Sequence, residues 1–516
     1  MSNLYEEKVK IQNKTKTLEQ LVEILERHRA EHKKIVHCHG VFDLLHVGHI
    51  RHFQQAKKFG DILVVTLTPD KFVNKGPHRP TFPDHLRAEV IAALDSVDYV
   101  AINKWPQATQ AIELLQPNFY VKGSDYKEAE KDHTGGIKLE EAAVKAVGGQ
   151  IVFTEDITFS STSLINRHLS SFPEEVTSYL EGFSDKYSSG DIFKYLDDAK
   201  KYKVLIVGET IIDEYQYCEA IGKSSKEPML AVKRVNTEKF VGGILAVANH
   251  ISSFAGEVGI VSFLGDNNSQ EDFIREKLNK KVKPTFLYRK NSPTIVKRRF
   301  IESYFFTKMM EVYEINDGLL DPNDNKLFCE TLRKELPKYD IVIVFDFGHG
   351  VFTKEAIDVL CKNAKFLTVN AQTNAGNVGY QSIVKYPRAD YVCLTENEMR
   401  MEARDRRGDL KEMVKRMAEE FDYKRVTVTR GNNGCMCYDK QDGFVEVPAF
   451  AGKVLDRMGA GDAYLSITAL CVAQKAPLEV TGFIGNAAGA QAVATVGHRS
   501  FIEKVSLYKH IESLLK

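Results

Sequence analysis

Apolar and polar residues alternate along the first third of the chain in a way that distinguishes strands from helices. Residues 16–33 place Leu18, Leu21 and Leu25 at helical spacing with charged residues between them, and residues 50–59 repeat this spacing. Short apolar runs of strand type stand between the helical patterns, at residues 35–38, 62–66, 99–102, 119–121 and 150–153. This alternation predicts a Rossmann-like α/β domain with a parallel sheet, which binds ligands at the carboxyl ends of its strands.

The second part of the chain repeats the alternation after a polar stretch. Residues 171–202 contain no clear sheet run and are predicted to be a linker that can be partly helical. Strand-type runs resume at residues 203–208, 341–345, 366–369, 391–394 and 426–429, and an Ala- and Gly-rich helix is expected near the C-terminus, at residues 482–496. We therefore predict two different α/β domains, covering residues 1–170 and 203–516.

The composition narrows the class of partners. The chain has 516 residues, and its 70 basic residues balance its 70 acidic ones. A nucleic-acid or anionic-membrane binder would normally carry a basic excess, so small phosphorylated molecules are the expected partners. Residues 1–8 lack an apolar signal core, and no run approaches the roughly 18 apolar residues of a membrane span, which predicts a cytoplasmic protein. The eight cysteines are scattered and are expected to be reduced and mostly buried.

The residues from Gly40 to His49 join a predicted strand to a predicted helix. This run, Gly-Val-Phe-Asp-Leu-Leu-His-Val-Gly-His, contains a glycine turn and two histidines one helical step apart. Free N–H groups and the positive dipole end of a helix N-terminus stabilise phosphate charge, and imidazoles add hydrogen-bond donors for the charge that develops in nucleotidyl transfer. Taken alone, the two histidines would favour the structural alternative, a pair of histidines at a helix entry.

The motif resembles the signature of the cytidylyltransferase-like nucleotidyltransferases, and further motifs follow in that family's order. These are Arg79-Pro80, Arg87, the run from Val121 to Tyr126 and the run from Ser160 to Ser163. The resemblance implies that His46 and His49 stabilise the α- and β-phosphates, and that Lys58 and Arg87 neutralise phosphate charge. It also implies a nucleotide-binding set, namely Gly40, Phe42, Asp43, Gly48, Lys122, Asp125, Ser161, Thr162 and Ser163.

A second group of small residues stands near the C-terminus. Gly459, Ala460 and Gly461 lead into an apolar helix and leave main-chain N–H groups open to a transferring phosphoryl group. Asp462, at the start of that helix, is the candidate base for an attacking hydroxyl. A helix N-cap aspartate after a glycine turn is the structural alternative.

This run resembles the second signature of the ribokinase-like (PfkB) sugar kinases, whose other motifs follow in order over residues 203–516. The resemblance implies sugar contacts from Asp213, Gly242 and Gly243 and a substrate-phosphate contact from Lys297 and Arg299, in a strand that begins with Thr294. It further implies a nucleotide site, formed by Thr429, Gly431, Gly434, Gly459, Ala460, Gly461 and Asn486. Glu398 would belong to a Mg²⁺ site.

Three residues depart from the kinase pattern. Ala246 stands where an asparagine is usual, with Asn249 as its possible replacement, and His349 stands where the heptose kinases carry a lysine. Thr395 replaces the asparagine of the N-x-x-E motif, although Glu398 is kept. These departures leave open whether the kinase half is catalytically active or serves as a sugar-nucleotide sensor or oligomerisation module.

Together the two halves resemble the bifunctional heptose-phosphate kinases/adenylyltransferases, with the order of the domains reversed. The resemblance implies ATP-dependent phosphorylation of a sugar or sugar phosphate, followed by nucleotidyl transfer from a second triphosphate, ATP or CTP, with release of pyrophosphate. Mg²⁺ is the implied cofactor and a homodimer or higher homo-oligomer the implied assembly. Because the Gly40–His46 run also resembles glycerol-phosphate cytidylyltransferases, a polyol-phosphate cytidylyltransferase fused to a kinase is the alternative.

Overall fold

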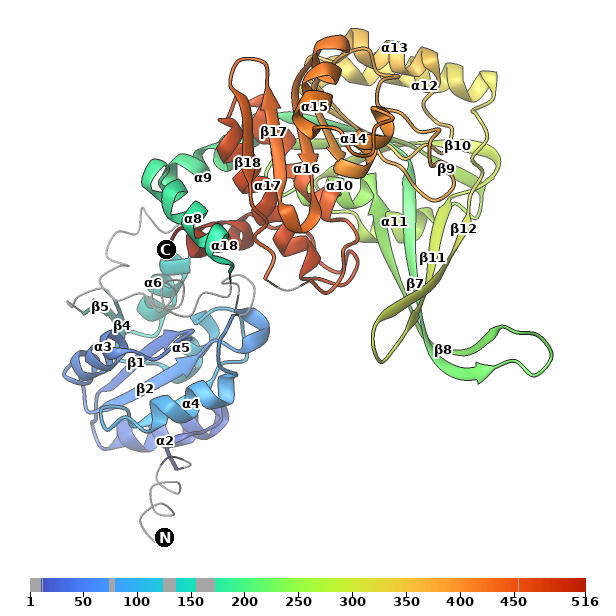
Figure 1. The fold of residues 1–516 in the computed structure, drawn as a ribbon. Helices are drawn as coiled ribbons and strands as arrows, with labels where there is room; N and C mark the ends of the chain where they lie inside the picture. The colour runs from blue at the N-terminus through green and yellow to red at the C-terminus, as the bar shows by residue number, and fades with distance from the viewer. Residues whose placement is uncertain (1–10, 12, 74–78, 124–135, 155–171, 453) are drawn as a thin grey trace. The chain divides into compact units, whose positions relative to one another are not determined.

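The structure is a computed structural model that describes residues 11, 13–73, 79–123, 136–154, 172–452 and 454–516 (Figure 1). The chain divides into two compact units. The first contains residues 1–173 and 508–516, and the second contains residues 174–507. Among the described residues, no helix is both long and apolar enough to cross a membrane.

The first unit is built on one parallel sheet in the strand order β3-β2-β1-β4-β5. Its strands are β1 (Ile35–Gly40), β2 (Ile62–Leu67), β3 (Tyr99–Ile102), β4 (Phe119–Lys122) and β5 (Gln150–Phe153). The strand order reverses its direction between β1 and β4, and open α/β sheets bind ligands at the carboxyl ends of the strands beside such a point. The motif that begins at Gly40 therefore lies where a nucleotide cleft is expected.

Helices cover this sheet and close its core. They are α2 (Leu18–Ala30), α3 (Val47–Lys57), α4 (Asp84–Ala92), α5 (Thr109–Leu115) and α6 (Gly136–Ala146), with a 3-10 turn, η1, at Asp70–Phe72. The first begins with a capping box in which Thr17 and Gln20 exchange hydrogen bonds, and it buries Leu18, Leu21 and Leu25, as their helical spacing predicts.

The second unit contains a nine-stranded sheet in the order β10-β9-β6-β13-β14-β15-β16-β17-β18. Its strands are β6 (Lys203–Gly208), β9 (Glu257–Asn267), β10 (Val282–Pro293), β13 (Ile341–Asp346), β14 (Leu367–Ala371), β15 (Ala389–Thr395), β16 (Tyr423–Thr429), β17 (Cys435–Asp439) and β18 (Gly443–Val447). Neighbouring strands are parallel as far as β16, and β17 and β18 add an antiparallel edge. Central strands such as β13 are buried along their whole length, which explains their continuous apolar runs.

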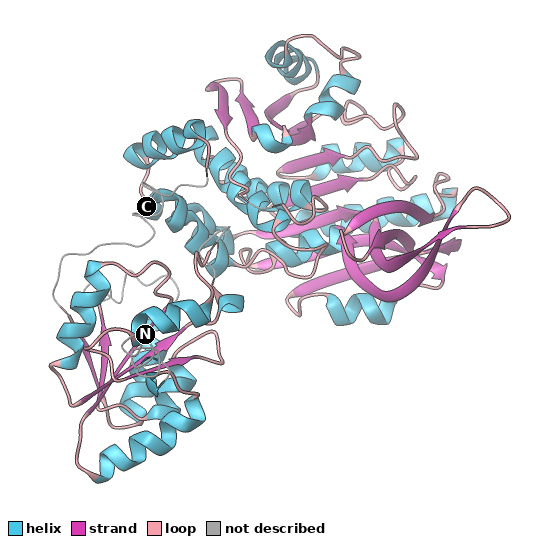
Figure 2. Ribbon diagram, turned by 60° about the horizontal axis from the view of Figure 1, so that its bottom comes forward, coloured by secondary structure: helices cyan, strands magenta, loops and turns pink. Residues whose placement is uncertain are grey.

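A separate four-stranded sheet, in the order β12-β11-β7-β8, extends from one side of this unit (Figures 1 and 2). Its strands are β7 (Thr210–Lys223), β8 (Leu230–Gly243), β11 (Ile295–Glu302) and β12 (Thr307–Glu314). Since β7 follows β6 after a single residue, Glu209, the chain passes directly from the large sheet into the small one. The small sheet was not among the elements that the sequence pattern predicts.

Helices of the second unit cover the large sheet (Figure 2). They are α8 (Glu174–Lys186), α9 (Ser189–Asp198), α10 (Ile244–Ile251), α11 (Glu271–Lys277), α12 (Pro322–Glu335), α13 (Lys354–Asn363), α14 (Glu396–Glu402), α15 (Leu410–Glu420), α16 (Ala460–Ala473) and α17 (Leu478–Val493). Short 3-10 turns lie at η4 (Ala199–Lys201), η5 (Leu336–Lys338) and η6 (Gly431–Asn433), and α18 (Lys504–Leu515) ends the chain. The predicted α/β class of both domains is thus confirmed.

The segment expected to be a linker is largely helical. Helices α8 and α9 occupy most of residues 171–202 and belong to the second unit. Phe183 of α8 stacks on Phe483 of α17 with ring centroids 4.2 Å apart, and Gln474 donates to the carbonyl of Tyr195. These contacts hold the segment against the core of the second unit, because a polar composition on the outer face of a helix does not prevent burial of its inner face.

Candidate active sites

His46 and His49 lie at the N-terminus of α3, directly after β1. His46 is the N-cap, where its Nδ1 accepts a hydrogen bond from the Gly48 amide at 3.1 Å. The two imidazole rings are stacked with centroids 4.0 Å apart, and His49 also meets the edge of Phe42 at 5.3 Å. Burial lowers the pKa of His46, which favours a neutral imidazole before a nucleotide binds. The structure therefore places both histidines at a helix N-terminus, where phosphate charge is stabilised.

The turn before α3 is held by buried ionic contacts. Phe42 has a positive φ of 47°, and its ring lies so close to Gly40 that a Cβ there would be 3.0 Å from Phe42 Cζ. The buried Asp43 carboxylate accepts from Arg79 at 2.7 Å and from the Thr81 amide. These contacts fix the path of the main chain from Gly40 to His46.

Arg87 is 3% exposed, and its guanidinium group hydrogen-bonds to other residues of the protein. It donates to the carbonyls of Phe82 at 2.9 Å, Thr68 at 3.0 Å and Val41, and to the Asp70 carboxylate at 2.6 Å. These contacts support a role in positioning the Val41–Asp43 turn. A direct contact with phosphate, which the family resemblance implies, stays a prediction.

The structure separates Lys58 from the histidines. Lys58 is the C-cap of α3, so about nine helical steps of ~1.5 Å, roughly 14 Å, divide it from His49 along the helix. Lys122, at the end of β4, is nearly buried and pairs with Glu140 at 2.8 Å. Asp125, Ser161, Thr162 and Ser163 lie outside the described residues.

Sequence reasoning missed three further histidines in this unit, of which His37 is buried and His39 and His52 are partly buried. His37 and His39 of β1 both contact the Thr66 hydroxyl, at 2.7 Å and 2.8 Å, and His52 of α3 contacts Thr154 at 2.9 Å. Burial lowers the pKa of His37 to about 3 and of His52 to about 4, so these rings are neutral. The only sequence signal for them was that His37 and His39 alternate along β1.

The second site is centred on the N-terminus of α16. Gly459 has a φ of 76° and caps the helix, and Asp462 lies in its first turn. The imidazole of His498 lies against Gly459, since a Cβ there would be 2.3 Å from His498 Cε1. Only glycine therefore fits both the conformation and the space at this position.

Asp462 is buried among other charges. Burial, and then the negative charge of Asp213, raise the pKa of Asp462 to about 7, while the positive charge of Lys297 lowers it. A carboxyl group with a pKa near neutrality is suited to general-base catalysis. The fold thus brings together Asp213, Lys297 and Asp462, which are far apart in the sequence. All three were candidate site residues in the sequence analysis.

Asp213 of β7 is the next polar group in this site. Arg299 donates to its Oδ1, and His498 Nε2 lies 3.8 Å from its Oδ2. A Cβ on Gly242 would lie 2.1 Å from the same Oδ2, so the first residue of the double glycine leaves room for this carboxylate. Arg299 also pairs with Glu311 at 2.6 Å, which leaves Lys297 as the more available cation.

Lys297 is 7% exposed, and no described residue accepts a hydrogen bond or ion pair from its ammonium group. The ammonium lies over the rings of Tyr313 and Phe347, at 5.3 Å and 5.7 Å, and burial lowers its pKa. A buried cation of this kind is costly unless an anion binds beside it. Its position supports contact with a substrate phosphate or with the transferring group.

Glu398 shares its carboxylate with main-chain donors. One oxygen accepts from the Thr373 amide at 2.8 Å, and the other accepts from the amide and hydroxyl of Thr395, both at 2.8 Å. Thr395, which departs from the family pattern, therefore forms a capping box with Glu398. The negative charge of Glu398 also contributes to the raised pKa of Asp462, so the two carboxylates share one electrostatic environment.

The predicted nucleotide loop lies at the end of β16. Thr429 ends that strand, and Gly431 and Gly434 both have positive φ, 57° and 75°. Asn486 of α17 donates to the carbonyls of Val447 and Pro448 at 3.0 Å and 2.8 Å. These contacts hold the chain after β18 against α17, at the residue that the resemblance assigns to the nucleotide site.

The structure shows the surroundings of the two remaining departures, Ala246 and His349. Ala246 is fully buried in α10, and the Asn249 side chain is occupied by the carbonyl of Lys277 and the amide of Asn279. Asn249 is therefore not available to replace the missing asparagine. His349 lies in the turn after β13, which Glu209 holds through the amides of Phe347 and His349 at 3.0 Å and 3.1 Å.

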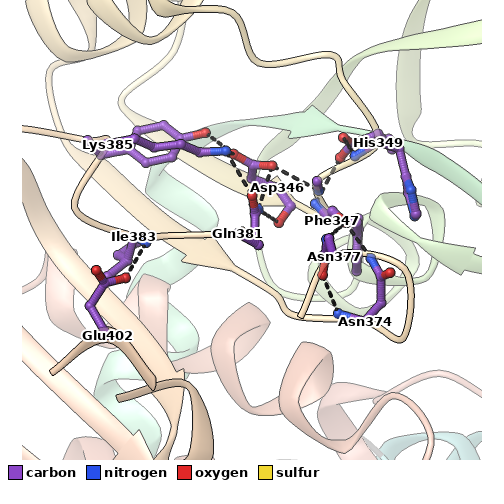
Figure 3. Close-up of polar contacts among 12 residues, drawn as sticks. Asp346, Phe347, His349, Asn374, Asn377, Gln381, Ile383, Lys385 and Glu402 are labelled. Atoms are coloured by element: carbon purple, nitrogen blue, oxygen red, sulfur yellow. Dashed lines mark hydrogen bonds and ion pairs between the residues drawn. The ribbon is translucent and has the colours of Figure 1, made fainter. Parts of the chain in front are cut away.

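The turn around His349 is extensively hydrogen-bonded (Figure 3). Asn374 and Asn377 donate to the carbonyl of Phe347, at 2.7 Å and 2.9 Å. Lys385 pairs with Asp346 at 2.6 Å. These contacts join the turn to the segment from Asn374 to Lys385.

Comparison with known proteins agrees with this architecture. Residues 201–505 match the pfkB family of carbohydrate kinases, and residues 37–168 match the cytidylyltransferase-like family, in the order that the sequence predicts. Because the first match covers more than half of the chain, the protein belongs to the pfkB family of carbohydrate kinases.

Individual relatives match over parts of their length. The bifunctional protein HldE of Geobacter metallireducens is 39% identical over 168 residues, which cover 31% of this chain and 32% of that protein. The bifunctional protein HldE of Campylobacter jejuni is 24% identical over 317 residues, covering 61% and 66%. The crystal structure of phosphofructokinase-2 from Escherichia coli in complex with potassium aligns with a TM-score of 0.49 and 16% identity, over 61% of this chain and 100% of that one. The chain thus spans between about one third and two thirds of the length of these curated relatives.

Proposed function

We propose that this protein is a bifunctional sugar-activating enzyme, in which residues of the second unit phosphorylate a sugar and residues of the first unit transfer a nucleotide to the resulting sugar phosphate. The observation that carries the proposal is the placement of Asp462 in the first turn of α16, with a pKa of about 7 and beside Asp213 and Lys297. The stacked His46–His49 pair at the start of α3 supports the second activity.

In the kinase step, the sugar hydroxyl attacks the γ-phosphorus of ATP. Asp462 takes the hydroxyl proton, a new O–P bond forms, and the bond between the γ-phosphorus and the bridging oxygen breaks to release ADP. The main-chain amides of Gly459–Gly461 stabilise the charge on the transferring group, and Asp213 orients the sugar. Lys297 neutralises the incoming phosphate charge.

Mg²⁺ fits this site as a partner of the nucleotide phosphates, because Mg²⁺ uses one or two protein carboxylates together with phosphates and water. Glu398 would hold it, with Asp462 in the same electrostatic environment. When bound, the ion neutralises phosphate charge.

In the transferase step, an oxygen of the sugar phosphate attacks the α-phosphorus of a nucleoside triphosphate, and pyrophosphate leaves. The phosphate nucleophile is already ionised at neutral pH, so no general base is needed. His46 and His49 donate to the phosphate oxygens as charge develops, while Arg87 and Asp43 hold the turn that positions them. The product would be a nucleoside-diphosphate sugar of the ADP-heptose kind, with ATP or CTP as the nucleotide donor.

We further infer a cytoplasmic homo-oligomer. The four-stranded sheet and its hairpins carry exposed apolar side chains, among them Ile221, Met229, Leu230, Val235, Met310 and Val312. Exposed apolar surface of this kind is typical of subunit contacts. Light scattering at several protein concentrations tests this inference.

The decisive experiment measures both reactions on the purified full chain. ADP release is followed with ATP and a panel of sugars and sugar phosphates, and pyrophosphate release with ATP or CTP and a panel of sugar 1-phosphates and polyol phosphates. D462N should abolish ADP release and leave pyrophosphate release intact. If no sugar is phosphorylated by the unaltered chain, the kinase half acts as a sensor; preference for CTP and a polyol phosphate would favour the cytidylyltransferase alternative.

A further inference from the structure

His498 adjoins two parts of the proposed kinase site, although none of the motifs found in the sequence includes it. It lies in a turn after α17, and its imidazole packs against Gly459, the residue that caps α16. Its Nε2 lies 3.8 Å from Oδ2 of Asp213, and the charge of Asp213 raises the pKa of Asp462. His498 therefore contacts the start of the phosphoryl-binding turn and faces the carboxylate that is predicted to bind the sugar.

The two atoms that face each other, His498 Nε2 and Asp213 Oδ2, have no hydrogen-bond partner among the described residues. Arg299 donates to the other oxygen of Asp213, Oδ1. A separation of 3.8 Å is too long for a direct hydrogen bond between the imidazole and the carboxylate. The side chain of His498 is only 6% exposed and that of Asp213 only 8%. Buried polar atoms without partners are unfavourable, so this pair points to a ligand atom that bonds to both.

A hydroxyl group fits this pair better than a phosphate oxygen does. Burial lowers the pKa of His498, so the imidazole is neutral at pH 7 and has one N–H donor and one acceptor nitrogen. The Asp213 carboxylate accepts hydrogen bonds and donates none, so its partner must be a donor. A hydroxyl oxygen about 2.8 Å from each atom donates to the carboxylate and exchanges a second hydrogen bond with the imidazole. An ionised phosphate oxygen has no hydrogen to donate, and the carboxylate repels it.

The position of His498 relative to Asp462 shows which hydroxyl this is. Gly459 and Asp462 are three residues apart at the start of α16, which is about 4.5 Å along the helix. The charge of Asp213 raises the pKa of Asp462 and also that of His498, so this carboxylate is near both side chains. Asp462 serves the hydroxyl that is phosphorylated in the proposed reaction. The hydroxyl beside His498 is therefore a second one on the same sugar.

Neighbouring groups hold the His498 ring in this orientation. The Gly497 amide donates to Oδ2 of Asp456 at 3.0 Å, which anchors the turn. The ring of His250 meets that of His498 edge-on, with centroids 6.2 Å apart, and Gly459 supports the ring from the cap of α16. A side chain that is already fixed loses little conformational entropy when a substrate binds.

We propose that His498 is a substrate-binding residue of the kinase half, and that one hydroxyl of the acceptor sugar lies between His498 Nε2 and Asp213 Oδ2. This hydroxyl donates to the carboxylate and exchanges a hydrogen bond with the imidazole. The inference rests on the proposed kinase function and names a residue that sets its acceptor specificity. A sugar that lacks this hydroxyl, or carries a phosphate on it, is a poor acceptor.

The test measures ADP release by the full chain with six- and seven-carbon aldoses and ketoses, and with monodeoxy derivatives of the best acceptor. H498L and H498N should each raise the KM of the best acceptor at least about tenfold and leave the KM of ATP within about twofold. H498Q should retain most of the acceptor affinity, because the longer amide reaches the position of Nε2 and asparagine does not. For one monodeoxy derivative, H498L should cause no further rise in KM, because the bridging hydroxyl is already absent.

Three results would overturn the inference. They are an unchanged acceptor KM in H498L, an equal loss with every monodeoxy derivative, and a loss in H498Q as large as that in H498N. An equal loss with every derivative would instead assign His498 to packing against Gly459. If H498L does not fold, the polar pair H498N and H498Q carries the same test, since the two amides differ only in length.

A binding measurement separates this inference from the proposed kinase function. If the unaltered chain phosphorylates no sugar, the same panel is titrated by calorimetry. Binding that H498N weakens and H498Q retains would keep the His498 site and reject the kinase. Binding that neither substitution changes would reject the His498 site, and an absence of binding would reject both proposals.

Discussion

Lys308 Nζ lies 2.5 Å from Oδ1 of Asp456, and this ion pair joins the four-stranded sheet to the turn that precedes Gly459. The other carboxylate oxygen of Asp456 accepts from the Tyr215 hydroxyl at 2.7 Å and from the Gly497 amide at 3.0 Å. One buried carboxylate therefore connects β12 and β7 with the loop that carries the predicted phosphoryl cradle. The position of the small sheet and the geometry of the cradle are coupled through Asp456.

The first prediction concerns this link. K308M should leave the Asp456 carboxylate buried without its cation and lower the free energy of unfolding by about 2 kcal/mol. ADP release should also fall, mainly through kcat, because the cradle is displaced and no substrate contact is removed. Thermal unfolding and steady-state kinetics measure the two effects. K308R is the matched control and should restore most of both; equal damage from K308R and K308M would contradict the charge argument.

Gly242 provides the second prediction. In G242A the new Cβ would meet Asp213 Oδ2 at 2.1 Å, so the carboxylate must move. The KM of the acceptor sugar should rise at least tenfold, with a loss of roughly 1–3 kcal/mol in stability from overpacking. G182A is the control, because no atom lies within 4 Å of its added Cβ and alanine favours the helix α8. An unchanged acceptor KM in G242A would remove Asp213 from the sugar site.

The third prediction follows from the pKa of Asp462, which is about 7. Asp462 accepts a proton only when it is ionised, so kcat/KM for ADP release should rise about tenfold per pH unit below pH 7 and level off above it. D213N removes a negative charge that raises this pKa, so the midpoint of the remaining activity should shift to lower pH. Activity that falls as the pH rises through 7 would exclude Asp462 as the base.

The fourth prediction separates the two roles of His46. Asparagine is a good N-cap, so H46N should keep the stability of the first unit within a few tenths of a kcal/mol, whereas H46A should lose about 1 kcal/mol. Both substitutions should lower pyrophosphate release by about 10²–10³-fold if the imidazole stabilises developing phosphate charge. Full activity in H46N would show that His46 serves only as the helix cap.

Much of the site was predictable because strand-to-helix junctions and glycine turns are local. The residues from Gly40 to His49 form the end of β1, a turn and the start of α3, and Gly459–Asp462 form the start of α16, as their patterns predict. Consecutive residues at such a junction lie close together in any fold, because the geometry of the strand and the helix fixes their relative positions.

Contacts between distant segments were not predictable in the same way. The family resemblance implies that Lys58 acts together with the two histidines, and the structure shows that Lys58 lies at the other end of α3. Arg87 has its acceptors at Val41, Thr68 and Asp70, which the chain path brings to it. No local sequence pattern predicts which residues will accept hydrogen bonds from Arg87.

The amino-acid sequence by itself determined two α/β domains, their order, and the two glycine-rich junctions at Gly40–His49 and Gly459–Asp462. Only the tertiary structure decided that Asp456 joins Lys308 and Tyr215, and that His498 lies against Gly459. The physical reason is that apolar periodicity and turn residues act over a few positions, whereas burial, charge pairing and the pKa of Asp462 depend on which distant segments the packed core brings together.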